Sequence, residues 1–368
     1  MQGFLQTLGA CLPAHAAALL CAPVARRFLT GFPSSAGILI VTRQTALFLT
    51  DSRYIEAARA HVSVCTVQEL LDASKQLRRF CKAEDIRRVF LETESATLAD
   101  VRKYRRWLPD CIIETEERRV DRALRKMRRE KRPWQVDCII RAQRIAEAAY
   151  AALLTEDVRA GITERELALA LDSRLLRGGA EALSFETIVV AGENGASPHG
   201  VPSDRALRHG DLVTLDFGAV CQGWHSDMTR TFALGAVCEA QRNIFETVLT
   251  AQKTALDALR PGLSCKEADD AARRVVEQAG YGEYFRHGTG HGVGLEIHEA
   301  PVLSPKSKDT LAPGDVVTVE PGIYVPGVCG VRIEDMALIT ENGSQNLTLA
   351  PKEFHCVCAS AVLPERNG

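Results

Sequence analysis

One nine-residue segment of this chain occurs twice. Gly210–Gly218 reads GDLVTLDFG, and Gly314–Gly322, which lies 104 positions later, reads GDVVTVEPG. In both copies apolar residues alternate as in a half-buried strand, and a turn containing glycine follows. The acidic position is kept while its residue changes from Asp216 to Glu320. The chain therefore contains two related halves, and each half is expected to build a strand hairpin.

Each copy is followed by a second strand-like run that carries another acid. Asp227 stands in HSDMTRTFAL, and Glu334 stands in VRIEDMALI. A turn at 221–222 would place Asp216 opposite Asp227 on one face of the first hairpin. A turn centred on Gly327 would place Glu334 opposite the acid of the second copy. Two hairpins therefore offer four carboxylates.

Carboxylates that face each other in such hairpins repel. Side chains directly opposite in an antiparallel pair lie roughly 4.5–5.5 Å apart, where like charges destabilise the sheet. At about 5 Å and an effective dielectric constant near 20, the repulsion is roughly 3 kcal/mol for each pair. The residues flanking Asp216 are apolar, so its strand is expected to be buried, and a buried carboxylate must be paired, protonated or bound to a metal. The four acids therefore predict a cation site.

A run rich in glycine and histidine lies between the two acidic hairpins. HGTGHGVGLEIHEAP spans His287–Pro301, and its imidazoles can bind a metal or move protons near neutral pH. Another histidine stands in the turn-rich segment ASPHGVPSD, before the first acidic strand. Each histidine alone would be interpreted as structural, but beside four acids they become candidate site residues. These are His199, His287, His291 and His298.

Composition limits the classes of partner and location. The chain has 368 residues, 46% of them hydrophobic and 25% charged, with a net charge of −2, so more than one domain and no nucleic-acid partner are expected. Twelve cysteines without a CxxC pair are interpreted as reduced thiols of a cytoplasmic protein, and no metal site is expected at Cys356 and Cys358. No run is long enough to span a membrane, and Ala16–Cys21 lacks the basic leader of a secretory signal.

Two domains of different class are expected. Residues 1–121 alternate strands and helices, which indicates an α/β domain; residues 122–132 form a charged connector; and residues 133–368 interleave long helices with antiparallel hairpins, which indicates an α+β domain. The strands predicted in the first domain are 37–41, 46–50 and 89–93, and its helices are 54–61, 73–82 and 99–107. The second domain is expected to carry a helix opened by Pro133 and helices over 164–176, 239–259 and 265–279, with Thr163 as an N-cap and Ser264 preceding the last helix.

The motifs resemble those of the pita-bread metallopeptidases, which include methionine aminopeptidase, Xaa-Pro aminopeptidase and Xaa-Pro dipeptidase. The matching segments are LDFG, SDMTRTF, HGTGHGVGLEIHE, VEPGIY and RIED. The stretches RFLTGFPSSAGILIV and LFLTDSRYIEAA resemble the creatinase-like N-terminal domain of this family, so the resemblance covers nearly the whole chain. It implies a pita-bread second domain, a pseudo-twofold antiparallel sheet with flanking helices. The N-terminal domain favours the proline-directed branch, because methionine aminopeptidases usually lack it.

The resemblance implies a centre of two divalent metal ions. Asp227 and Glu334 would bridge the ions, Asp216 would chelate one, and His291 with Glu320 would hold the other. Four carboxylates and one imidazole suit Mn²⁺, the expected metal, or Co²⁺, Zn²⁺ or Fe²⁺. A hydroxide that bridges the ions would be the nucleophile.

The resemblance also assigns roles around the metals. Glu320 would receive the proton of the nucleophile, while His199 and His298 would stabilise the developing oxyanion or the leaving imide nitrogen. Arg332 shares a strand face with the second bridging acid, where it would anchor a substrate carboxylate, orient a ligand or form a structural ion pair. His287 is a further candidate for substrate binding.

The expected function is removal of the first residue from peptides that begin Xaa-Pro, whose tertiary amide has no N–H. An Xaa-Pro dipeptidase (prolidase) stays open as the nearest alternative, because the sequence does not show how the pocket closes around the substrate's C terminus. The N-terminal domain disfavours a methionine-type aminopeptidase. The complete ligand set disfavours a creatinase-type hydrolase and an inactive pita-bread binding module. A homodimer is expected from the family, whereas the native metal, the preferred first residue and the peptide length stay open.

Overall fold

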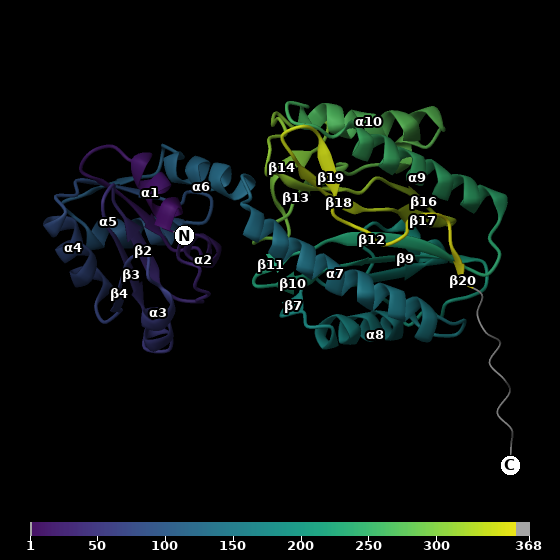
Figure 1. The fold of residues 1–368 in the computed structure, drawn as a ribbon, viewed down its shortest axis with the longest axis horizontal. Helices are drawn as coiled ribbons and strands as arrows, with labels where there is room; N and C mark the ends of the chain where they lie inside the picture. The colour runs from purple at the N-terminus through teal and green to yellow at the C-terminus, as the bar shows by residue number, and fades with distance from the viewer. Residues whose placement is uncertain (1, 358–368) are drawn as a thin grey trace, which may run out of the picture. The chain divides into compact units, whose positions relative to one another are not determined.

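The structure, a computed structural model, describes residues 2–357 of the 368-residue chain. The chain forms two compact units, Met1–Arg128 and Arg129–Gly368. Figure 1 shows that each unit has sheets and covering helices of its own. The first unit is α/β and the second is α+β, so the predicted fold class is confirmed.

One six-stranded sheet forms the centre of the first unit, with the strand order β4-β3-β2-β1-β5-β6. β1 pairs antiparallel with β2 and parallel with β5, and it is buried along its whole length, so the apolar N-terminal run is a core strand. The strands are β1 (Ala16–Leu20), β2 (Ile38–Val41), β3 (Ala46–Thr50), β4 (Thr66–Glu69), β5 (Arg88–Leu91) and β6 (Ile112–Glu114). The helices are α1 (Gln2–Ala10), α2 (Pro23–Thr30), α3 (Ile55–His61), α4 (Ala73–Ala83), α5 (Leu98–Trp107) and α6 (Arg119–Arg129).

The charged segment over residues 122–132 is largely helical. Most of it belongs to α6, whose Val120, Leu124 and Met127 are buried while the arginines between them keep the helix charged. The division between the two compact units falls at Arg128 and Arg129, near the end of this helix.

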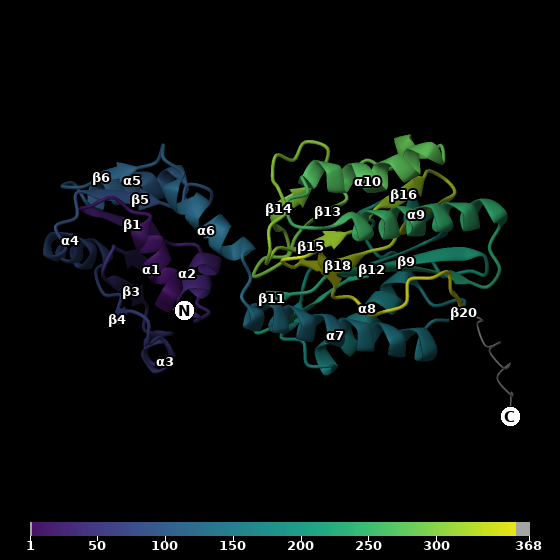
Figure 2. The ribbon, with the colours of Figure 1, turned by 45° about the horizontal axis from the view of Figure 1, so that its top comes forward.

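The second unit repeats a framework of two helices followed by three antiparallel strands. The strand order is β8-β9-β12 in one sheet and β13-β15-β18 in another, and Figures 1 and 2 show α7 and α8 on one side of these sheets and α9 and α10 on the other. This is the predicted pseudo-twofold arrangement. The first half holds α7 (Pro133–Glu156), α8 (Glu164–Arg177), β8 (Ile188–Ala191), β9 (Asp211–Phe217) and β12 (Met228–Leu234); the second holds α9 (Glu239–Ala258), α10 (Cys265–Gln278), β13 (Gly290–Gly292), β15 (Val316–Val319) and β18 (Asp335–Ile339).

Shorter elements complete the second unit. β16 and β17 form a two-stranded ribbon that continues the β15–β18 hairpin, and β10 and β11 continue the β9–β12 hairpin. These elements are β7 (Ala182–Leu183), β10 (Ala219–Cys221), β11 (Trp224–His225), β14 (Glu299–Leu303), β16 (Gly322–Val325), β17 (Cys329–Arg332), β19 (Ser344–Asn346), β20 (Cys356–Val357) and the 3-10 turns η1 (Gly192–Ala196) and η2 (Gly282–Tyr284).

Alternation along β9 explains why an acid stands in a buried strand. Val213, Leu215 and Phe217 join the apolar core beneath α7 and α8. Thr214 points to the other face, where its hydroxyl donates to the carbonyl oxygen of Gly330 in the second half. Because side chains of a strand alternate between its faces, Asp216 shares the face of Thr214 and is directed towards the second half.

The predicted register of the first hairpin is wrong by two residues. Its turn lies at Gln222 and Gly223, whose φ angles of 51° and 78° are both positive, as a type I′ turn requires. Asp216 therefore pairs with Thr229, not with Asp227. The two acids still share a face of the hairpin, because a shift of two residues preserves the side to which a strand residue points.

The second hairpin has the predicted register. Val319 pairs with Asp335 on one side of the acids and Gly322 pairs with Arg332 on the other. Both ladders share the register that places Glu320 opposite Glu334, although neither acid lies within a strand. At the interruption the backbone N–H of Glu320 donates to the carbonyl oxygen of Thr289 and that of Glu334 to the carbonyl oxygen of Thr229, so both acids are tied to neighbouring segments instead of to each other's strand.

Two further expectations concern membranes and cysteines. Over residues 2–357, no helix is long and apolar enough to cross a membrane. The cysteines of the same range are all free. Cys356 is exposed, and Cys358 lies outside the described residues, so the structure does not describe that pair.

Candidate active site

A cavity of about 690 Å³ in the second unit collects every site residue predicted from the sequence. They come from both acidic hairpins, from the glycine-rich run and from the segment before β9, and thus from four separate parts of the chain. The residues are His199, Asp216, Asp227, His287, His291, His298, Glu320, Arg332 and Glu334.

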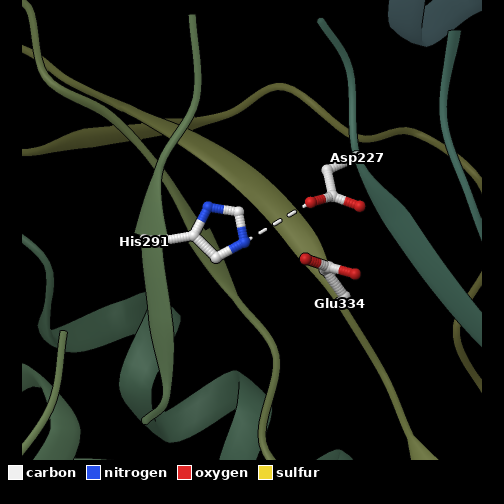
Figure 3. Close-up of side chains that lie close together, drawn as sticks. All are labelled: Asp227, His291 and Glu334. Carbon is white, nitrogen blue, oxygen red and sulfur yellow. Dashed lines mark ion pairs between the residues drawn. The ribbon is translucent and has the colours of Figure 1, made fainter. Parts of the chain in front are cut away.

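Three of these side chains converge closely. Asp227 directly precedes β12, His291 lies on β13, and Glu334 directly precedes β18. Ligand atoms of all three lie within 4.8 Å of one another, and Figure 3 shows the imidazole and both carboxylates directed into the same space. The group draws one acid from each half of the unit and its histidine from the segment that joins their hairpins.

The imidazole of His291 presents a lone pair to the acids. Its Nδ1 lies 3.1 Å from the carbonyl oxygen of Gly292, to which it donates, so Nε2 is the unprotonated nitrogen of the neutral ring. Burial lowers the pKa of His291 to about 4, which keeps the ring neutral at physiological pH. Nε2 lies 3.5 Å from Asp227 Oδ2 and 3.4 Å from Glu320 Oε1. Three electron-rich atoms therefore face one another.

Burial and mutual repulsion make the charged form of these carboxylates unfavourable. Burial raises the pKa of Asp227 and of Glu334 well above the usual range of a carboxyl, and neighbouring carboxylates raise it further. Burial also raises the pKa of Glu320 to about 8. Among the described residues, nothing donates a hydrogen bond to Oδ1 of Asp216 or to Oε1 of Glu334, although both atoms are buried. An unsatisfied buried acceptor costs about 1–3 kcal/mol.

Divalent cations fit this set of residues. A cation between the acids and the imidazole turns their mutual repulsion into attraction and satisfies the two buried oxygens that lack a donor. Four carboxylates and one imidazole are mostly hard oxygen ligands, which suit Mn²⁺ and similar metals better than thiolate-binding ions.

Comparison with known proteins agrees with this chemistry. The family described as "Metallopeptidase family M24" matches residues 137–341, and "Creatinase/Prolidase N-terminal domain" matches residues 14–129. The chain belongs to metallopeptidase family M24. It is therefore a metallopeptidase, an enzyme that hydrolyses peptides with the help of divalent metal ions.

Three relatives of this M24 chain have informative names. An Xaa-Pro dipeptidase of Pyrococcus horikoshii is 38% identical over 331 residues, which cover 88% of this chain and 89% of the relative. The structure of an Xaa-Pro dipeptidase from Bacillus anthracis has a TM-score of 0.92 at 34% identity and covers 96% of this chain and 99% of its own. That of an X-Pro aminopeptidase from Thermotoga maritima has a TM-score of 0.86 at 33% identity, with coverage of 93% and 97%.

Arg332 of the M24 unit is held in place by several acceptors. Its side chain is buried, and Nη2 lies 2.6 Å from Asp216 Oδ2. Nη1 donates to the hydroxyl of Tyr324 at 2.8 Å and to the carbonyl oxygen of Pro198 at 3.2 Å, while Nε donates to Thr229 Oγ1 at 3.2 Å. Arg332 therefore forms an ion pair with Asp216, one of the four acids of the cluster, and further acceptors hold its guanidinium in place.

The three remaining histidines differ in their access to the cavity. His287 donates from Nδ1 to the carbonyl oxygen of Gly288, and its Nε2 accepts from the Tyr324 hydroxyl at 2.9 Å. Burial lowers the pKa of His287 to about 4, so this ring is a neutral, fixed acceptor. His199 and His298 are exposed, and the ring of His298 lies 4.3 Å from that of His291, centroid to centroid.

Three supporting residues were missed by sequence reasoning. Tyr324 accepts from Arg332 and donates to His287, Thr229 Oγ1 donates to Glu334 Oε2 at 2.6 Å, and Thr318 Oγ1 donates to Glu320 Oε1 at 3.2 Å. The VEPGIY motif did contain a signal for the tyrosine. Alternation along β16 puts Tyr324 on the face of Gly322, and a Cβ at Gly322 would clash with the Tyr324 hydroxyl. The contact of Thr229 had no sequence signal, because its partner Glu334 lies 105 positions away in the chain. Thr318 stands only two residues before Glu320, so alternation along the repeated segment was a signal for that contact.

Proposed function

We propose that this metallopeptidase hydrolyses the bond between the first residue of a peptide and a proline in the second position. The observation that carries the proposal is the convergence of five ligand-type side chains and two exposed histidines in one cavity. The relatives support the choice of substrate, because their names specify Xaa-Pro peptides.

Asp216, Asp227, His291, Glu320 and Glu334 are proposed to hold two divalent ions, with Mn²⁺ as the expected metal. Such ions supply Lewis acidity and an activated water when they are bound. Oδ1 of Asp216 and Oε1 of Glu334 are buried and have no donor among the described residues, so a bound cation would satisfy both oxygens.

Proton transfer is assigned to Glu320. Its carboxyl has a pKa of about 8 in the protein alone because of burial, and a bound cation would lower this value towards neutrality or below. A carboxyl in that range can accept a proton and return it to a leaving nitrogen. Thr318 Oγ1, at 3.2 Å from Glu320 Oε1, holds the carboxylate in position.

His199 and His298 are proposed to contact the substrate. Both are exposed and line the cavity, so neither is closed off by the protein. An N–H of each ring can donate to the carbonyl oxygen or to the leaving nitrogen, which carry charge or a lone pair as the bond breaks. His287 supports the site from within, through its bond to Tyr324.

The engagement of Arg332 with Asp216 favours cleavage of peptides longer than two residues. Among the described residues that line the cavity, it is the one Lys or Arg side chain, and it is buried against Asp216 and Tyr324. The C-terminal carboxylate of a dipeptide would find no other guanidinium or ammonium partner in this lining. A longer peptide carries that charge out of the cavity, so an aminopeptidase is the preferred assignment.

A dipeptidase is the second candidate, because an Xaa-Pro dipeptidase is 38% identical to this chain. Turnover of Ala-Pro and Ala-Pro-Ala by the Mn²⁺-loaded enzyme separates the two. We expect a higher kcat/KM for the tripeptide, and cleavage confined to Ala-Pro would establish the dipeptidase. Cleavage of Met-Ala-type peptides with both proline peptides left intact would refute Xaa-Pro specificity.

Composition and the family resemblance guide the proposals for location and assembly. The abundance of cysteine without paired spacing suits a reducing compartment, so we propose that the enzyme acts in the cytoplasm. A homodimer remains a prediction of the family resemblance. The molar mass in solution, measured by light scattering against the 40.2 kDa chain, tests it.

A further inference from the structure

Outside the ionisable cluster, the active-site cavity has a mainly apolar lining. Ile188 pairs directly with Asp216 in the β8–β9 ladder, so apolar surface begins beside a proposed metal ligand. Val201 and Val302, which are 79% and 46% exposed, also line the cavity and leave apolar surface open to a bound ligand. The apolar side chains of the lining are Phe185, Ile188, Pro198, Val201, Pro202, Ile297 and Val302.

One carboxylate interrupts this apolar lining. Glu186 is exposed, lines the cavity and stands two residues before Ile188. Thr187 stands between them, and its hydroxyl donates at 2.5 Å to Asp172 of α8, so this side chain points away from Glu186 and Ile188. No described residue forms a hydrogen bond or ion pair with the Glu186 carboxylate. Its negative charge is therefore available to a bound ligand.

The other charges of the lining are already engaged. The four remaining acids belong to the proposed metal set, and Arg332 is paired with Asp216. Glu186 is thus the one charged residue of the described lining that lies outside the metal cluster and its supporting contacts. It lies at most about 7 Å along the chain from Ile188, since two residues rise no more than that. This distance is compatible with the reach of a flexible four-carbon lysine stem.

We infer that Glu186 makes the enzyme prefer peptides whose first residue is lysine or arginine. This inference rests on the proposed function and specifies its substrate class. The hydrocarbon stem of such a residue covers apolar lining while its cationic end reaches the carboxylate, as long cationic side chains do at many protein surfaces. An acidic first residue would be repelled by the same group.

The size of the preference follows from solvent exposure. Exposed ion pairs are worth little, so the gain in kcat/KM for a cationic first residue is about two- to fivefold. Salt screens exposed charges, and the preference is expected to shrink as ionic strength rises from about 0.05 to 0.5 M.

The test compares Lys-Pro-Ala with norleucine-Pro-Ala, whose first side chain has the same stem without the ammonium group. The Mn²⁺-loaded wild-type enzyme should cleave the lysine peptide with the higher kcat/KM. In Glu186→Gln the ratio of kcat/KM for the lysine peptide to that for the norleucine peptide should fall to about one. Glu193→Gln is the matched control, because Glu193 is exposed in the neighbouring η1 and is absent from the cavity lining. The control should keep the wild-type ratio.

The possible failures are distinct. Equal ratios in the wild type and in Glu186→Gln overturn the inference while cleavage of norleucine-Pro-Ala upholds the proposed function. A wild-type preference for the norleucine peptide also overturns it. If the wild type cleaves neither peptide, the proposed function fails and the inference fails with it.

Discussion

Asp211 in the first half of the M24 unit and Asp315 in the second stand at matching positions of the repeat and make matching contacts. Asp211 pairs with Arg205 at 2.7 Å, and Asp315 pairs with Arg129 at 2.6 Å. Each aspartate also accepts, at 2.8 Å, from a backbone N–H three residues earlier in the chain. The start of the repeated strand is therefore built in the same way twice.

The halves differ at the first acid of each hairpin, which is Asp216 in one and Glu320 in the other. Asp216 lies inside β9, whose ladder with β12 is continuous. In the second half the ladder stops at Val319–Asp335 and resumes at Gly322–Arg332, and the acids in the gap are glutamates. Asp216 thus comes from a regular strand and Glu320 from an interrupted one, whereas Asp227 and Glu334 both lie in a gap directly before the last strand of their hairpin. The two halves therefore present the first acid differently and the second acid in the same way.

Contacts across the halves make the site a joint product of both. Thr229 of the first half donates to Glu334 of the second, and Arg332 of the second half donates to Asp216 of the first, each at 2.6 Å. Each half thereby orients a carboxylate that belongs to the other. It follows that either half by itself would lack a correctly held ligand set.

The largest expected effect comes from removing one acid of either half. Asp227→Asn and Glu334→Gln keep the shape of the side chain but remove charge at the proposed bridging positions. We expect each to lower kcat/KM by more than about a hundredfold. Mutation of residues that only hydrogen-bond to metal ligands already costs about 10–100-fold, and loss of a ligand should cost more. Activity assays with metal analysis measure both losses. Near-normal turnover in either variant would show that the replaced acid is not an essential ligand.

The contacts across the halves should matter less than the ligands. Thr229→Val removes the donor to Glu334, and Arg332→Lys replaces a fork that serves several acceptors by a single ammonium group. We expect each to weaken metal binding or activity by about 10–100-fold. Isothermal titration with Mn²⁺ and steady-state kinetics give the two quantities.

The conservative variant Thr229→Ser provides the control for this prediction. It keeps a hydroxyl near Glu334 and should recover most of the metal affinity. If Thr229→Val binds Mn²⁺ as tightly as the wild type, the contact between the halves does not hold the ligand in place.

Without metal, the stability of the protein should depend on the protonation of Glu320 in the second half. In the metal-free protein the pKa of Glu320 is about 8, above the roughly 4.3 of an unfolded carboxyl, so the fold favours the protonated form. That stabilisation is complete below about pH 4 and is lost as the pH rises through 8. The melting temperature of chelated enzyme should therefore fall between about pH 5 and pH 9.

Glu320→Gln tests the source of that fall. Glutamine stays neutral, so the chelated variant should lose several degrees less than the chelated wild type over the same pH range. Mn²⁺ should restore the wild type at high pH, because a cation favours the charged carboxylates. A melting temperature of the chelated wild type that rises with pH would contradict this account.

The same comparison shows what the sequence could predict. The repeated segment, its alternation and the two following acids were sufficient to locate both hairpins and the cluster, because these signals are local or periodic. The register of the first hairpin was not predictable to the residue: Cys221–Gln222 and Gln222–Gly223 are adjacent choices, and positive φ at both Gln222 and Gly223 decides between them.

Contacts between the halves were beyond the sequence for a different reason. Thr229 and Glu334 are separated by 105 positions, and nothing in either segment specifies that they touch. Arg332 could be placed on the face of its strand, but its partners were left open because three of them come from other elements. The packing of two similar halves supplies this information, and only coordinates show it.

The smallest expected effect tests how far the halves are equivalent. Thr163 is the N-cap of α8 and Ser264 is the N-cap of α10. Each hydroxyl accepts from the backbone N–H three residues later at 3.1 Å, that of Glu166 in one helix and of Glu267 in the other. Thr163→Ala and Ser264→Ala should each cost about 0.5–2 kcal/mol of stability without changing kcat/KM. Urea unfolding measures the cost. Two similar losses would mean that the repeat extends to energetics, whereas a loss confined to one variant would limit the equivalence to geometry.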